Sequence, residues 1–217
     1  AIDGVLFSKD GTRLLAYPSS KTGSTYQIPE GVTIIDELAF SHGYYNKSSD
    51  KLRKVILPDS YTIRMPDANF ANQLNPQNSL ANAFYKNSGV NEIAVKPSNT
   101  KYMVEDGILY TKDGSTCLYI PAYKTTVNIR EGCTSIKCAY FTPTTALHTQ
   151  SEKTFVFNIP ASVTYISDYG NSDYPNENVL KYMNDLINMS QYYNATYNID
   201  ANNSVYTTDS NGCIVKK

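Results

Sequence analysis

Residues 26–40 read YQIPEGVTIIDELAF, and residues 127–141 repeat this pattern as VNIREGCTSIKCAYF. Shorter versions of the opening occur at 55–63 (VILPDSYTI), 93–102 (IAVKPSNTKY) and 157–166 (FNIPASVTYI). The position after the last apolar residue recurs at spacings of 29, 38, 34 and 30 residues, at Pro29, Pro58, Lys96, Arg130 and Pro160. Repeats of this length predict a solenoid of stacked units rather than a globule with an enclosed catalytic cleft.

Each unit is predicted to be a short strand that ends at a turn. In LRKVILP (52–58), Leu52, Val55 and Leu57 are apolar. Because side chains alternate along a strand, Val55 and Leu57 are expected to point into the core. Proline is tolerated where the ladder ends. The segments GVTII and GCTSI predict a second short strand. The Ala-aromatic pairs in ELAF, CAYF and NAF are expected to fill the core from a helical turn.

A second repeated element is a β-hairpin. Residues 3–18, DGVLFSKDGTRLLAYP, match residues 106–121, DGILYTKDGSTCLYIP, and a weaker third copy, NSVYTTDSNGCIV, lies at 203–215. Gly and Asn at the centre of each copy supply the positive φ that hairpin turns need. This alignment places Cys213 at the position equivalent to Cys117. It also makes NTKYMVE before the second copy and NATYNIDAN before the third copy equivalent lead-in segments.

The motifs I-P-E-G-V-T-x-I-x-x-x-A-F and L-x-x-I-x-I-P, with the inserted D-G-V-L-F-S-K-D-G hairpin, resemble the BspA-like (Treponema pallidum type) leucine-rich-repeat family of bacterial surface proteins. The resemblance covers most of 1–166 and returns at about 197–215. It implies a strand-rich α/β leucine-rich-repeat solenoid with short helical turns and inserted hairpins. It further implies an extracellular or cell-surface location and a role in adhesion or protein recognition, without a shared ligand. We expect residues 1–217 to form a single solenoid domain.

Two insertions depart from the family pattern, at about 60–81 and 171–196. The second contains apolar residues at helical spacing: Val179, Leu180, Met183, Leu186 and Ile187. This spacing predicts an amphipathic helix that starts just after Pro175. We expect this helix to pack on the flank of the solenoid; the alternative is a partner-binding helix. The chain opens at AIDG without a lead-in segment, which suggests either a mature N-terminus or a fragment of a larger protein.

Composition narrows the classes of partner. Lys and Arg number 19 against 20 Asp and Glu, a net charge of −1, so no basic field attracts nucleic acid or an anionic membrane. The longest apolar runs fall short of the ~18 residues of a membrane-spanning helix, so no membrane insertion is expected. A chain with 19 Tyr, 18% charged residues and abundant Asn and Thr favours a strand- and turn-rich extracellular protein.

The residue types that carry catalysis do not form a pattern. The two histidines, His42 and His148, are far apart in the sequence, and no HExxH, GxSxG, Walker or GxGxxG motif occurs. Asp3 and Asp106 recur at equivalent hairpin positions, as do the KDG aspartates Asp10 and Asp113, which indicates turn formation rather than a calcium site. We therefore expect no enzyme, no cofactor and no metal.

Four cysteines leave the redox state open. Cys117, Cys133, Cys138 and Cys213 contain no CxxC pair, so neither a zinc site nor thioredoxin-like chemistry is indicated. We expect buried, reduced cysteines that act as small apolar residues. The alternative is a disulfide framework, with three pairings that the sequence does not distinguish.

The candidate binding residues are those that point outward from the predicted strands. They form a mixed, nearly neutral strip whose main members are Gln27, Lys54, Ile56, Glu92, Asn128 and Asn158. Such a strip fits a polar partner, and we expect a host or bacterial surface protein bound by a monomer. A glycan is the second candidate, and a spacer whose strand residues are merely solvated is the third. Exposed tyrosines at 44–45 and 192–193 would be suitable anchors at modest entropic cost.

Overall fold

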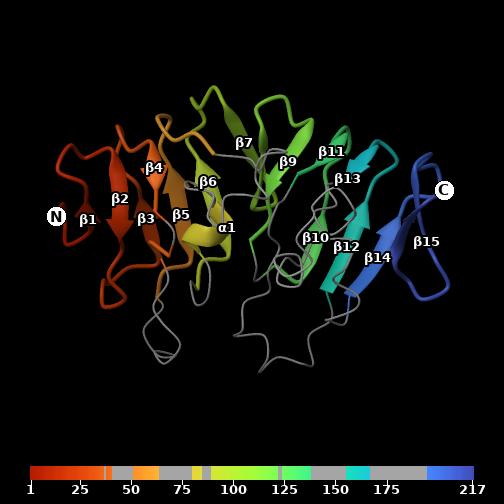
Figure 1. The fold of residues 1–217 in the computed structure, drawn as a ribbon, viewed down its shortest axis with the longest axis horizontal. Helices are drawn as coiled ribbons and strands as arrows, with labels where there is room; N and C mark the ends of the chain where they lie inside the picture. The colour runs from red at the N-terminus through yellow and green to blue at the C-terminus, as the bar shows by residue number, and fades with distance from the viewer. Residues whose placement is uncertain are drawn as a thin grey trace, which may run out of the picture.

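The computed structural model describes residues 1–36, 38–40, 51–63, 80–84, 89–121, 124–137, 155–166 and 195–217. Short strands stack side by side along the long axis from the N-terminus to the C-terminus (Figure 1). The described helix is a single turn, α1 (Leu80–Ala83), so the helical share of this part of the chain is small. The strands are β1 (Leu6–Phe7), β2 (Arg13–Ala16), β3 (Thr25–Gln27), β4 (Ile34–Ile35), β5 (Lys54–Leu57), β6 (Glu92–Val95), β7 (Tyr102–Glu105), β8 (Ile108–Thr111), β9 (Thr116–Tyr119), β10 (Thr126–Asn128), β11 (Ser135–Ile136), β12 (Phe155–Ile159), β13 (Tyr165–Ile166), β14 (Ala195–Ile199), β15 (Tyr206–Thr208) and β16 (Ile214–Lys216).

Two parallel sheets hold the first strand of each repeat. One sheet has the order β3-β5-β6 and the other the order β10-β12-β14. In the first, Tyr26 lies opposite Val55, and Val55 lies opposite Ile93. In the second, Val127 lies opposite Phe157. This register confirms the alignment of the repeats made from the sequence, because equivalent apolar residues occupy neighbouring rungs.

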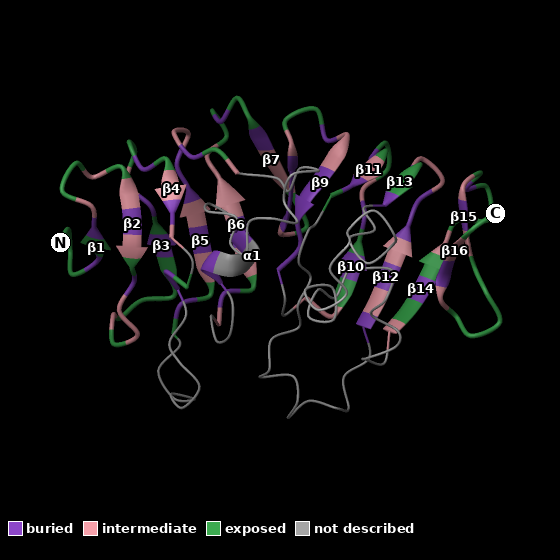
Figure 2. Ribbon diagram, in the orientation of Figure 1, coloured by how far each residue is buried: buried purple, intermediate pink, exposed green. Residues whose placement is uncertain are grey.

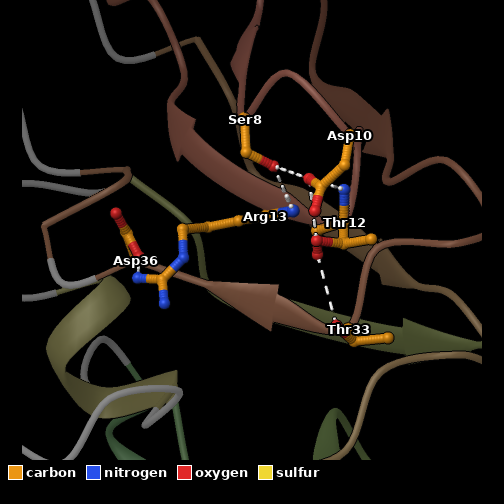
Figure 3. Close-up of polar contacts among 6 residues, drawn as sticks. All are labelled: Ser8, Asp10, Thr12, Arg13, Thr33 and Asp36. Atoms are coloured by element: carbon orange, nitrogen blue, oxygen red, sulfur yellow. Dashed lines mark hydrogen bonds and ion pairs between the residues drawn. The ribbon is translucent and has the colours of Figure 1, made fainter.

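The second strand of each repeat forms a separate layer with the hairpins. Strand β4 pairs in parallel with β2, while β11 pairs in parallel with both β9 and β13. The predicted hairpins at 3–18 and 106–121 are confirmed as the antiparallel pairs β1–β2 and β8–β9. Strand β7 adds to the edge of β8, which the sequence did not predict. An ion pair joins the first hairpin to the segment after β4: Nη1 of Arg13, in β2, lies 2.5 Å from Oδ1 of Asp36 (Figure 3).

Apolar side chains between the two layers form the core. Figure 2 shows buried segments alternating with half-buried and exposed ones along the strands, as side-chain alternation requires. Phe40 and Phe84, from the predicted Ala-aromatic pairs at 39–40 and 83–84, are buried and stack with ring centroids 4.8 Å apart. Tyr17 packs on Phe40 at 5.4 Å. Burial and the neighbouring tyrosine raise the pKa of Tyr26 to about 12.

The hairpin aspartates organise their turns. Asp10 Oδ1 accepts hydrogen bonds from Ser8 Oγ at 2.5 Å and from the Thr12 backbone nitrogen at 3.1 Å (Figure 3). Asp113 accepts the same pattern of hydrogen bonds in the second hairpin, where the Thr111 hydroxyl donates at 2.6 Å. These donors lower the pKa of both carboxyls, that of Asp113 to about 2. The predicted turn-forming role of the two aspartates is thus confirmed by their hydrogen bonds.

A buried asparagine precedes each of the antiparallel pairs β7–β8 and β15–β16. Asn99 is 1% exposed and Asn203 is fully buried. Each side-chain oxygen accepts backbone N–H bonds from the residues two and three positions later, at 2.7–2.9 Å. Three residues beyond each asparagine, the hydroxyls of Tyr102 and Tyr206 accept a backbone N–H of the preceding unit, from Ile63 at 2.8 Å and from Ile166 at 2.9 Å.

These contacts correct the alignment of the third hairpin. Because Asn203 and Tyr206 repeat the bonds of Asn99 and Tyr102, the pair β15–β16 is equivalent to β7–β8 and not to β8–β9. Cys117 lies within β9 and is fully buried, whereas Cys213 directly precedes β16 and is half-buried. The two cysteines therefore do not occupy equivalent positions. The similarity of the KDG and SNG turns produced the wrong alignment, since many hairpins share such a turn.

The first insertion begins later than predicted. Residues 60–63 still follow the repeat: the Tyr61 backbone nitrogen bonds the Pro58 carbonyl, as that of Val32 bonds Pro29, and Tyr61 is fully buried. The insertion therefore starts after residue 63, and β14 starts at Ala195, inside the predicted second insertion. The predicted helix after Pro175, both histidines, Cys138, the CAYF pair and the tyrosines at 44–45 and 192–193 lie outside the described residues.

Candidate binding face

All six candidate binding residues point outward from the parallel strands. We define the strand face as the half-buried or exposed side chains of β3, β5, β6, β10, β12 and β14 that flank the central inward residue of each strand. Its members are Thr25, Gln27, Lys54, Ile56, Glu92, Ala94, Thr126, Asn128, Val156, Asn158, Thr196 and Asn198. The face has an N-terminal half on β3-β5-β6 and a C-terminal half on β10-β12-β14 (Figure 1).

In the N-terminal half, an ion pair lies beside an apolar patch. Lys54 and Glu92 are opposite each other on β5 and β6, and Lys54 Nζ bonds Glu92 Oε1. Their side chains are 34% and 47% exposed, so water screens this pair and its contribution to stability is small. Two residues further along each strand, Ile56 lies between Gln27 and Ala94. An apolar side chain thus lies beside an amide and two opposite charges.

The C-terminal half carries a ladder of amides. Asn158 Nδ2 donates to Asn128 Oδ1 at 2.7 Å, and Asn198 Nδ2 donates to Asn158 Oδ1 at 2.8 Å. Asn128 Nδ2 lies 3.4 Å from Asp106 Oδ2, and Lys124 Nζ lies 3.0 Å from the other oxygen of that carboxylate. The three amides therefore donate in one direction, toward a carboxylate whose charge is balanced by a lysine.

The sequence reasoning placed Asn128 and Asn158 on this face but missed Asn198. The signal was present as the recurring triplet of an apolar residue, Asn and Ile, at 127–129, 157–159 and 197–199. The ladder itself was not predicted, because it requires the parallel register that puts the three asparagines on adjacent rungs. The ion pair between Lys124 and Asp106 has an equivalent in the first hairpin, where Lys21 Nζ lies 2.6 Å from Asp3 Oδ2.

The other reactive side chains among the described residues lie in turns or in the core. Within the described residues, no group of three or more His, Cys, Asp or Glu side chains is arranged to hold a metal ion. Cys117 and Cys133 are buried, and Cys133 Sγ donates to the Ser135 carbonyl at 3.3 Å. None of the helices in the described part of the chain has the length and apolar character of a membrane span.

Comparisons with known proteins give three structural similarities. No family model matches the chain, and no curated protein does so either. A leucine-rich-repeat protein from Eubacterium ventriosum is similar over 65% of this chain and 37% of its own, with 18% identity and a TM-score of 0.37. The pneumococcal vaccine antigen PcpA follows at 64% and 34%, with 15% identity and 0.32. A leucine-rich cell-surface protein from Faecalibacterium prausnitzii gives 65% and 37%, with 21% identity and 0.31. The matched part thus spans little more than a third of each of these structures.

Proposed function

We propose that this chain is a non-catalytic recognition or adhesion module of the BspA-like type, secreted or displayed on a bacterial cell surface. It binds a host or bacterial surface protein through the strand face and acts as a monomer. The proposal involves no cofactor, no nucleic acid and no membrane insertion.

The observation that supports this proposal best is the parallel register of the strands within each of the two sheets. Tyr26, Val55 and Ile93 are buried on adjacent rungs, so the residues beside them form regular rows that face away from the core. Stacked repeats typically present such extended surfaces to partners. The net charge of −1 favours a partner that is recognised by shape and hydrogen bonds over a highly charged one.

A glycan is the second candidate ligand, favoured by the amide ladder. Asn128, Asn158 and Asn198 present neutral polar groups at the rung spacing of a parallel sheet, about 4.8 Å. A neutral, hydroxyl-rich glycan chain could form hydrogen bonds with such a row of amides. A structural spacer is the third candidate, in which case the strand face has no ligand.

The test is a binding screen of the purified chain against immobilised fibronectin, laminin and collagen and against a glycan array. The variant Ile56→Asp/Asn128→Asp changes one residue in each half of the strand face. Tyr165→Asp is the matched control, because Tyr165 is 51% exposed on β13, in the other layer.

A protein ligand lost in the double variant and retained in Tyr165→Asp supports the proposal. A signal restricted to the glycan array supports the second candidate. Silence on both panels, or binding that both variants retain, contradicts recognition through the strand face. Circular dichroism of each variant must first show that the fold is intact.

A further inference from the structure

The two halves of the strand face differ in how far their polar groups are already satisfied. In the C-terminal half, the Asn158 amide donates to Asn128 and accepts from Asn198. The Asn128 amide accepts from Asn158 and donates to the Asp106 carboxylate. Each of these amides thus uses its oxygen and one N–H inside the protein. A ligand would have to compete with bonds that polarise and strengthen one another.

The N-terminal half retains more capacity for a ligand. Within the described part of the chain the Gln27 side chain makes no hydrogen bond, and it is exposed. Ile56 and Ala94 lie on adjacent rungs and form a small apolar patch that the fold leaves half-buried. Lys54 and Glu92 border this patch with opposite charges. They bond each other through Nζ and Oε1, and their half-exposed side chains keep two ammonium N–H groups and the second carboxylate oxygen for a ligand. Burying these apolar groups under a ligand would release water from them.

This arrangement has the character of a protein-binding surface. Protein interfaces combine a small apolar centre with a polar, partly charged rim, and the centre carries most of the binding energy. Ile56 and Ala94 would be the centre, and Gln27, Lys54 and Glu92 the rim. A polypeptide can complement both charges at once, with an acid against Lys54 and a base against Glu92. A neutral glycan complements neither charge.

We infer that the N-terminal half of the strand face is the part that binds the protein partner, an inference that rests on the proposed function. The partner is an extended polypeptide segment that places an apolar side chain on Ile56 and Ala94, with an acidic and a basic residue against Lys54 and Glu92. The amide ladder of the C-terminal half stabilises the stack of strands and contributes little to binding.

The test uses a phage-displayed library of random linear peptides, selected on the folded chain, followed by affinity measurements with the enriched peptides. We expect peptides in which an apolar residue is flanked by an acid and a base. Ile56→Asp should weaken their binding by at least about tenfold, as loss of a central interface contact does. Asn158→Asp should change affinity less than about threefold while it lowers the melting temperature, because it removes an amide donor from the ladder.

A charge-reversal variant provides a control that keeps the ion pair. Lys54→Glu/Glu92→Lys retains opposite charges on neighbouring strands, so the fold should persist. It should select peptides with the acid and the base in exchanged positions. If the enriched sequences do not change, the charged rim does not contribute to recognition and the inference is wrong in that respect.

The remaining outcomes separate the inference from the proposed function. If Asn158→Asp abolishes peptide binding and Ile56→Asp does not, the strand face binds proteins but the assignment to the N-terminal half is overturned. If neither variant affects binding, both the inference and the proposed use of the strand face are overturned. If no peptide is enriched while the matrix-protein screen is positive, recognition of an extended segment is overturned and the proposed function stands.

Discussion

Asn203 is a buried residue whose substitution should lower the free energy of unfolding strongly. Its side chain is fully buried and makes hydrogen bonds in both directions. Nδ2 donates to the carbonyls of Pro160 and Val163 at 3.0 and 2.9 Å. Oδ1 accepts the backbone N–H groups of Val205 and Tyr206 at 2.9 and 2.8 Å. The amide thus joins the β15–β16 hairpin to the preceding repeat.

The substitution Asn203→Ala removes four buried hydrogen bonds to these backbone groups, of which the Pro160 carbonyl keeps a second bond, from the Val163 N–H. At about 1 kcal/mol for each group, the free energy of unfolding should fall by about 4 kcal/mol. That is a large part of the ~5–15 kcal/mol that stabilises a typical domain. With an m-value of about 2 kcal/mol/M in urea, the midpoint should shift by about 2 M. Because the chain has 19 tyrosines and no tryptophan, tyrosine fluorescence and circular dichroism are suitable readouts.

Asn198→Ala is the matched control, since this exposed side chain makes one hydrogen bond within the described residues, to Asn158. We expect it to cost less than about 1 kcal/mol. Asn203→Asp is a second test: it keeps the acceptor for Val205 and Tyr206 but removes both donors, so its cost should be at least as large as that of the alanine variant. A loss below about 1 kcal/mol for Asn203→Ala would refute the reasoning.

Three further predictions concern stability. Ile129→Ala should lower the free energy of unfolding by about 2–5 kcal/mol, because the side chain is 6% exposed in the core; urea denaturation measures this, and an unchanged midpoint contradicts it. Gly114→Ala should cost more than Gly11→Ala. Both glycines have φ near +75°, which costs alanine about 1–2 kcal/mol. A Cβ at Gly114 would also lie 2.0 Å from Arg130 Nη1, so the guanidinium must move and give up its bonds to the Gly114 carbonyl and Glu105; equal melting temperatures would refute this. The pKa of Asp113 is lowered from 3.8 to about 2, so its stabilisation is present above about pH 4 and lost toward about pH 2. The melting temperatures of Asp113→Asn and the parent should therefore differ at neutral pH and converge on acidification; a constant difference contradicts the prediction.

The sequence by itself determined the repeating units and their strands. The spacing of the recurring positions Pro29, Pro58, Lys96, Arg130 and Pro160 identified the units. Within each unit, apolar residues two apart identified a strand, because such residues share one side of it. The same alternation identified the outward residues of β3, β5, β6, β10 and β12, although those of β14 were missed. Local chemistry also sufficed for the turn aspartates, since their hydrogen bonds reach only to neighbours two residues away.

The tertiary structure alone decided which distant residues meet. Successive members of the ladder Asn128, Asn158 and Asn198 are 30 and 40 residues apart in the chain, and only the parallel register brings them together. Asn203 looked like an ordinary polar residue of a turn, yet burial makes it a structural link between repeats. Side-chain alternation fixes which way a residue points, but the partner that it finds there depends on how the repeats stack. The sequence therefore determined the outward face of most of the parallel strands. Stacking decided that the asparagines of the C-terminal half bond one another and that Lys54 and Glu92 pair in the N-terminal half.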